Sequence, residues 1–81
     1  MMKIEVLGPG CPKCELLEKN VRAAVQEMGI DAEVTKISAI KDIAARRVMM
    51  TPALSVNGQL VSSGHLLTVL QVKRLLEKGG H

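Results

Sequence analysis

The chain has 81 residues, of which 47% are hydrophobic and none is Phe, Tyr or Trp. We expect one small domain with an aliphatic core, because a second core would need a longer chain. The formal net charge of +3 comes from scattered basic residues, and no aromatic side chain is present for base stacking, so nucleic-acid binding is not expected. The sequence shows no apolar leader or spanning segment, so we expect neither secretion nor membrane insertion.

The first half of the chain is typical of a β-α-β unit. Residues 3–7 predict a strand, and a turn at residues 8–10 leads into a helix with Pro12 in its first turn, where the missing N–H costs nothing. Gly29 is expected to end that helix. Residues 31–37 alternate as in a second strand, which is parallel to the first because a helix connects them. The helix carries one apolar stripe, formed by Leu17, Val21, Ala24, Val25 and Met28.

The middle of the chain predicts a short helix and a hairpin. Residues 38–47 predict the helix, with Ser38 as its N-cap. The Asn-Gly pair at 57–58 is typical of a type I′ turn, which would join antiparallel strands at residues 53–56 and 59–61. The side chains expected on the buried side of the short helix are Ile40, Ile43 and Ala44.

A final helix is predicted from Thr68 to about Lys78. Thr68 and Gln71 fit a capping box, and Leu67 with Val72 would form a hydrophobic staple. The side chains expected to be buried are Val72, Leu75 and Leu76.

The last three residues, Gly79-Gly80-His81, resemble the stub of a linker and affinity tag. We therefore expect one domain at residues 1–78 and a flexible tail at residues 79–81.

The two cysteines, Cys11 and Cys14, have C-x-x-C spacing and lie at the predicted junction of the first strand and helix. In a reducing compartment this spacing indicates redox chemistry or metal binding, since a bridge across so short a loop would constrain the unfolded chain little. A helix N-terminus favours a thiolate at Cys11, while Cys14 is expected to be buried one turn into the helix. Lys13 adds a positive charge between them. If the pair is redox-active, we expect Cys11 to attack a disulfide and Cys14 to resolve the mixed disulfide.

The order βαβαββα, the run G-P-G-C-P-K-C after the first strand, and Thr51-Pro52 before the hairpin resemble the thioredoxin/glutaredoxin superfamily. The small single-domain redox-active disulfide proteins of archaea and bacteria are the most similar members. The resemblance implies an α/β, thioredoxin-like fold, with a four-stranded mixed sheet in the order 2-1-3-4 and three helices on its two faces. It also implies a cis Thr51–Pro52 bond, with Pro52 beside the sulfurs and the backbone of Thr51 pairing with an extended substrate peptide.

The resemblance further implies a cytoplasmic, monomeric thiol–disulfide oxidoreductase without a cofactor. Its partners would be disulfide-containing proteins or small-molecule disulfides, with a thioredoxin-reductase-like enzyme or glutathione as electron donor. Glutaredoxins hold glutathione with a Gly-Gly-Asp-like segment after the hairpin, where this chain has Ser-Ser-Gly-His at residues 62–65. A protein dithiol or a reductase therefore fits at least as well as glutathione.

Glu5 lies six residues before Cys11, the offset at which thioredoxins place a buried Asp that is thought to shuttle a proton for the resolving cysteine. The resemblance makes Glu5 a candidate general base for Cys14. The alternative is that Glu5 points into a partly wet gap or pairs with a lysine. Elsewhere, Met49 and Met50 are expected in the core rather than as an apolar lip beside the sulfurs.

Two other functions could use the same cysteines. The run G-x-x-C-x-x-C before an amphipathic helix also resembles ferredoxin-like heavy-metal-binding domains, whose thiolates carry a soft cation such as Cu(I). That fold needs a final strand, whereas this chain predicts a final helix. A zinc site is not expected, because His65 and His81 lack finger-like spacing to the cysteines. The remaining alternative is a degenerate redox domain that only binds partners.

Overall fold

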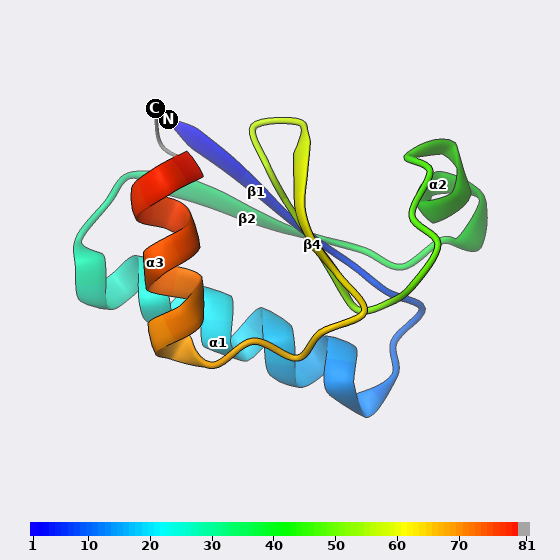
Figure 1. The fold of residues 1–81 in the computed structure, drawn as a ribbon, viewed down its shortest axis with the longest axis horizontal. Helices are drawn as coiled ribbons and strands as arrows, with labels where there is room; N and C mark the ends of the chain where they lie inside the picture. The colour runs from blue at the N-terminus through cyan, green and yellow to red at the C-terminus, as the bar shows by residue number, and fades with distance from the viewer. Residues whose placement is uncertain (80–81) are drawn as a thin grey trace.

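A four-stranded mixed sheet in the order β2-β1-β3-β4 organises the chain (Figure 1). The computed structural model describes residues 1–79. Strand β1 pairs in parallel with β2 and antiparallel with β3, and β3 pairs antiparallel with β4. The predicted order is confirmed, with the elements β1 (Met2–Leu7), α1 (Pro12–Met28), β2 (Ala32–Ile37), α2 (Ile40–Ala45), β3 (Ala53–Val56), β4 (Gln59–Ser63) and α3 (Val69–Gly79).

The two faces of the sheet are covered differently. Helices α1 and α3 pack together, and α2 lies apart from both (Figure 1). Side chains of a strand alternate between faces, so Ile4 and Val6 point into the main core with α1 and α3, while Leu7 points to the other face. There it packs with Ile43 of α2 and Ala53 of β3. The main core contains Ile4, Val6, Leu17, Val21, Ala24, Leu54, Val56, Val72 and Leu76.

Three of the turn and cap signals of the sequence are confirmed, at Gly29, at Asn57-Gly58 and at the start of α3. Gly29 ends α1 with a left-handed φ of 63°, and Asn57 and Gly58 both have the positive φ that a type I′ turn requires. At the start of α3 the backbone N–H of Thr68 donates to Gln71 Oε1 at 2.9 Å, and the N–H of Gln71 donates to Thr68 Oγ1 at 3.2 Å. These two bonds form the expected capping box.

Helix α2 differs most from its prediction. It begins at Ile40 after Ala39, which makes no side-chain cap, so the expected cap at Ser38 is wrong. Ile43 is its one buried residue, whereas Ile40 is 75% exposed and Ala44 is also exposed. A helix of six residues is shorter than two turns, so it reaches the sheet through a single side chain rather than an apolar stripe.

The connection from α2 to β3 is also more exposed than expected. Met49 is 91% exposed and Met50 is 62% exposed, so their expected place in the core is wrong. The chain runs over the surface between Val48, which is half-buried, and Pro52, which is buried.

The end of α3 lies close to its predicted position. The helix includes Gly79, which was expected to belong to the tail, while Gly80 and His81 of that expected tail lie outside the described residues. Among the helices of residues 1–79, none combines the length and hydropathy that crossing a membrane requires.

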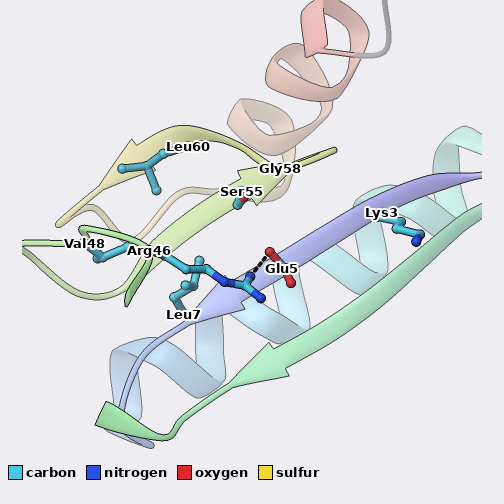
Figure 2. A pocket seen from close by; sticks show the side chains of 8 residues that line it. All are labelled: Lys3, Glu5, Leu7, Arg46, Val48, Ser55, Gly58 and Leu60. Carbon is cyan, nitrogen blue, oxygen red and sulfur yellow. Dashed lines mark hydrogen bonds and ion pairs between the residues drawn. The ribbon is translucent and has the colours of Figure 1, made fainter. Parts of the chain in front are cut away.

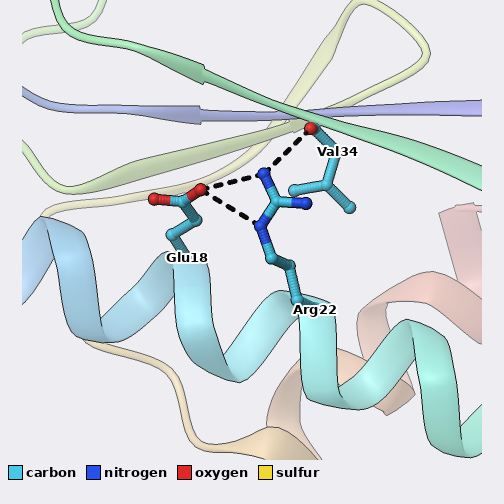
Figure 3. Close-up of polar contacts among 3 residues, drawn as sticks. All are labelled: Glu18, Arg22 and Val34. Atoms are coloured by element: carbon cyan, nitrogen blue, oxygen red, sulfur yellow. Dashed lines mark hydrogen bonds and ion pairs between the residues drawn. The ribbon is translucent and has the colours of Figure 1, made fainter.

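An ion pair on α1 connects this helix with the edge strand β2 (Figure 3). Arg22 donates from Nε and Nη2 to Glu18 Oε2 at 3.1 and 2.9 Å, and from Nη2 to the carbonyl oxygen of Val34 at 3.3 Å. Such a pair four residues apart on a helix stabilises it by only about 0.2–0.5 kcal/mol. Its added contact with Val34 helps to hold α1 over β2.

Candidate active site

Cys11 is the N-cap of α1, as the sequence predicts. Its backbone is extended, with φ −71° and ψ 160°, and its Sγ accepts a hydrogen bond from the backbone N–H of Cys14 at 3.3 Å. Pro12 follows as the first helical residue, where no N–H is needed. The thiol is half-buried and therefore remains accessible to a reactant.

The surroundings of Cys11 stabilise its thiolate. The pKa of Cys11 lies below the ordinary value of 9.0, first because the side chain of Cys14 donates a hydrogen bond to it and second because the backbone N–H of Cys14 does so. The N–H of Lys13 acts in the same direction. The side chain of Lys13 is exposed, so its ammonium is largely screened by solvent.

Cys14 has the opposite character. Its side chain is fully buried, and burial raises the pKa of its thiol above the ordinary value of 9.0. The hydrogen bond with Cys11 raises that pKa further, because the shared proton stays on Cys14. The site therefore holds one accessible sulfur that favours the thiolate and one buried sulfur that favours the thiol.

Gly8 places β1 directly against Cys14. A Cβ atom on Gly8 would lie 2.1 Å from Cys14 Sγ and 2.8 Å from Cys14 Cβ, and 3.9 Å from Pro52 Cα. Real Cβ atoms never approach a sulfur so closely, so glycine is required for this packing. The N–H of Gly8 also donates to the carbonyl of Ile37 at 2.9 Å, so Gly8 continues the pairing of β1 with β2 rather than opening the turn.

This role of Gly8 is absent from the sequence predictions. The signal that could have found it is a glycine directly after a buried strand and before a C-x-x-C helix, where a close approach of side chain to backbone is expected.

The peptide bond between Thr51 and Pro52 is cis, as the resemblance implies. Pro52 is buried, and its carbonyl accepts a hydrogen bond from the N–H of Gly64 at 2.9 Å. The Ser63 hydroxyl donates to the carbonyl of Met50 at 2.9 Å. Thr51 is exposed, and within residues 1–79 its N–H and C=O make no backbone hydrogen bond. An extended peptide could therefore pair with Thr51.

Met49 and Met50 form an exposed apolar lip directly before Thr51. The side chain of Met50 lies on Gly64, because a Cβ atom built there would be 3.1 Å from both Cβ and Cε of Met50. The exposure of both side chains therefore favours the lip over the core positions predicted from the sequence. Gly8 packs on Cys14 and lies near Pro52, and Gly64 lies against Met50 and donates to the Pro52 carbonyl. These contacts bring the C-x-x-C motif, Pro52 and the lip together.

Glu5 lies on the other face of the sheet, where it pairs with Arg46 (Figure 2). The pair crosses a cavity of about 430 Å³. This side-chain partner matches the sequence alternative of an ion pair, although the expected cation was a lysine. The causes that raise the pKa of Cys14 are its burial and Cys11, and Glu5 is not among them. The cavity is lined by Lys3, Glu5, Leu7, Arg46, Val48, Ser55, Gly58 and Leu60.

The Glu5 carboxylate also acts on Arg46. Its hydrogen bond is the main reason that the pKa of Arg46 lies above its ordinary value, and Asp42 adds a smaller attraction. Arg46 therefore stays fully charged. His65, by contrast, lies exposed in the loop between β4 and α3.

Comparison with known proteins identifies the family. Residues 2–77 match the family described as the thioredoxin domain. The chain belongs to the thioredoxin family. A protein named thioredoxin from Methanothermobacter thermautotrophicus is 42% identical over 76 residues, which cover 94% of this chain and 99% of that protein. A thioredoxin from Methanocaldococcus jannaschii is 38% identical over 77 residues, which cover 95% of this chain and 88% of that protein.

Family membership confirms two of the predictions made from the resemblance. The thioredoxin-like α/β fold is present, and the protein is a disulfide oxidoreductase with a C-x-x-C pair at Cys11 and Cys14. The ferredoxin-like alternative is not the fold of this chain, because α3 follows the hairpin where that fold has a strand. Within residues 1–79, no group of three or more His, Cys, Asp or Glu side chains is placed to hold a metal ion together.

Proposed function

We propose that the protein exchanges a Cys11/Cys14 dithiol with disulfides of other proteins. The observation that carries this proposal is the opposed character of the two sulfurs: Cys11 is accessible with a lowered pKa, and Cys14 is buried with a raised one. Only a thiolate attacks a disulfide, so the first step falls to Cys11. Cys14 must become a thiolate only in the second step, when Cys11 is already bonded to the substrate.

The reaction moves two electrons and two protons. The Cys11 thiolate attacks one sulfur of the substrate disulfide, a Cys11–substrate bond forms, and the other substrate sulfur leaves as a thiolate that takes a proton. Cys14 then loses its proton and attacks Cys11 Sγ. The Cys11–Cys14 disulfide forms as the Cys11–substrate bond breaks, and the second substrate sulfur leaves as a thiolate that takes up the proton released by Cys14. The substrate is reduced, and the protein is oxidised by the same two electrons.

The exposed segment around Thr51 supports the proposal that the substrate is a peptide. The free N–H and C=O of Thr51 can pair with an extended chain, and the exposed Met49 and Met50 offer flexible apolar contact beside it. Pro12 and Pro52 would shape the two sides of the bound disulfide. For Glu5, the proton-shuttle hypothesis stays a prediction beside its observed pairing with Arg46.

The electron donor is proposed to be a thioredoxin-reductase-like enzyme. Family membership supports a reductase-type donor, and residues 62–65 carry no acidic side chain of the kind that holds glutathione in glutaredoxins. A cytoplasmic location and a monomeric state stay predictions.

An insulin-reduction assay with dithiothreitol tests the proposal. The wild-type protein should accelerate precipitation of the insulin B chain, and Cys11→Ser should lower the rate to that of dithiothreitol alone. The matched variant Cys14→Ser should still attack, so mass spectrometry should detect a stable mixed disulfide between Cys11 and the substrate. Absence of reductase activity in the wild type, together with tight stoichiometric Cu(I) binding in a competition titration, would overturn the proposal in favour of the metal carrier.

A further inference from the structure

The weakest attachment in the fold is that of α2. This helix has six residues, its N-cap Ala39 supplies no side-chain hydrogen bond, and Ile43 is its one buried residue. A helix this short is not stable by itself, so tertiary contacts must hold it in place. Within residues 1–79, the polar side-chain contact that joins the α2 end to the sheet is the pair of Arg46 with Glu5.

Arg46 connects the end of α2 both to the sheet and to the residues that follow it in the chain. Its backbone N–H and that of Val48 both donate to the carbonyl of Ile43, at 3.2 and 3.4 Å. Its side chain crosses the cavity towards β1 and meets Glu5 (Figure 2). Val48 then packs against the small cluster of Leu7, Ile43 and Ala53. The chain from the end of α2 to Val48 is therefore held as one unit on the sheet.

The next residues of the chain belong to the candidate active site. Pro52 follows Arg46 by six positions, with Met49, Met50 and Thr51 exposed between Val48 and Pro52. On the far side, Ser63 and Gly64 hold this stretch through the carbonyls of Met50 and Pro52. The stretch is thus held at two ends, one of which depends on Arg46, and its middle is the proposed site of peptide pairing.

We propose that Arg46 is a positioning residue for substrate binding: by pairing with Glu5 it fixes the segment 47–52, so that the Thr51 backbone meets a protein substrate in register with Cys11. This inference rests on the proposed function and deepens it. Arg46 touches neither sulfur, and it acts only through the path of the segment. In this proposal Glu5, on strand β1, holds the Arg46 side chain in place.

The position of the pair makes the proposal testable without unfolding the protein. The side chains of Arg46 and Glu5 are 41% and 23% exposed, and partly exposed ion pairs contribute little to global stability. The pair also lies on the face of the sheet opposite the main core. Removing it should therefore change the position of the segment more than the stability of the fold.

The test compares Arg46→Gln with wild type in steady-state reduction of insulin and of a small aromatic disulfide. Arg46→Gln should raise KM for insulin about two- to fivefold, the range that loss of such a pair supplies, and leave kcat within error. The rate with the small disulfide should not change, because that substrate needs no peptide pairing. Arg46→Lys should restore part of the loss, and Arg74→Gln on α3, which removes the same charge elsewhere, should behave as wild type.

Glu5→Gln separates the positioning role from proton transfer. Positioning requires Glu5→Gln to raise KM as much as Arg46→Gln does, and the double variant to be no worse than either single variant. An unchanged KM for Arg46→Gln, or full additivity of the two changes, would overturn the proposal. A slower, pH-dependent resolution step in Glu5→Gln alone would overturn it in favour of the shuttle. If the wild-type protein itself shows no reductase activity, the proposed function has failed, and the positioning role of Arg46 is not what the experiment rejects.

Discussion

The active site is built from two segments that differ in how firmly the fold holds them. Residues 8–14 follow the central strand, begin a long helix and end at the fully buried Cys14. Residues 46–52 follow a helix with one buried side chain and cross the surface with both methionines exposed. The first segment carries the two cysteines, and the second carries the Thr51 backbone that we propose pairs with a substrate peptide.

This difference has a physical reason. A thiolate needs fixed hydrogen-bond donors, so the N-cap of a helix packed along a buried stripe of Cys14, Leu17, Val21 and Ala24 suits Cys11. A surface that accepts varied peptides benefits from flexible apolar side chains, which Met49 and Met50 supply. It also benefits from backbone groups that make no hydrogen bond within residues 1–79, which Thr51 supplies. Changes in the first segment should therefore alter stability and sulfur reactivity, and changes in the second should alter KM.

The largest stability effect is expected for Gly8→Ala. The new Cβ would overlap Cys14 Sγ, and a backbone or buried sulfur must move to relieve that contact. Overpacking of this kind costs about 1–3 kcal/mol, to be measured by urea unfolding of the reduced protein. Gly10→Ala is the control, because Gly10 has a positive φ of 91° but no atom within 4 Å of its Cβ position. It should be destabilised by backbone strain while the alkylation of both sulfurs stays normal. Normal Cys14 reactivity in Gly8→Ala would contradict the packing argument.

A smaller loss of stability is expected for Ile43→Ala in α2, the helix that precedes the second segment. Large-to-small changes in a core cost about 2–5 kcal/mol, and we expect a value of about 1–2 kcal/mol here because α2 can detach without opening the main core. KM for insulin should rise as in Arg46→Gln. The matched control is Ile40→Ala, since Ile40 lies three residues earlier on the same helix and is 75% exposed. An equal loss of unfolding free energy in the two variants would show that burial of Ile43 does not hold α2 on the sheet.

A change of thiol titration with little change of fold is expected for Cys14→Ala. The largest cause of the low Cys11 pKa is the hydrogen bond from the Cys14 side chain, so its removal should move the midpoint of Cys11 alkylation up towards 9.0. In wild type that midpoint should lie below 9.0. The rate of iodoacetamide modification from mildly acidic to alkaline pH measures both values, and an unshifted midpoint in Cys14→Ala would assign the effect to the helix N-terminus instead.

The directions of the two cysteine pKa shifts also predict how the stability of the reduced protein depends on pH. Cys11 has a lower pKa folded than unfolded, so its contribution is complete above pH 9.0 and disappears as pH falls through the folded pKa. Cys14 has a higher pKa folded than unfolded, so its contribution is present below pH 9.0 and is lost as pH rises through the folded pKa.

Local sequence signals determined most of the fold. The apolar stripe of α1, the Asn57-Gly58 turn and the Thr68–Gln71 capping box each depend on residues at most a few turns apart, so their geometry follows from backbone preferences and periodicity. The same holds for Cys11 as an N-cap thiol, because Pro12 and the helical pattern place the C-x-x-C motif at a helix start.

Only the tertiary structure decided the contacts between distant segments. Arg46 and Glu5 are 41 positions apart, and nothing near either residue indicates the other. The exposure of Ile40, Met49 and Met50 likewise depends on where the short helix α2 meets the sheet. The close packing of Gly8 on Cys14 depends instead on how the start of α1 lies against the end of β1. Hydrophobicity alone favours burial of these side chains, but an element with one anchor cannot bury them all. The sequence therefore predicted which sulfurs react, whereas only the folded chain showed that Arg46 pairs with Glu5 next to the segment that we propose binds substrate.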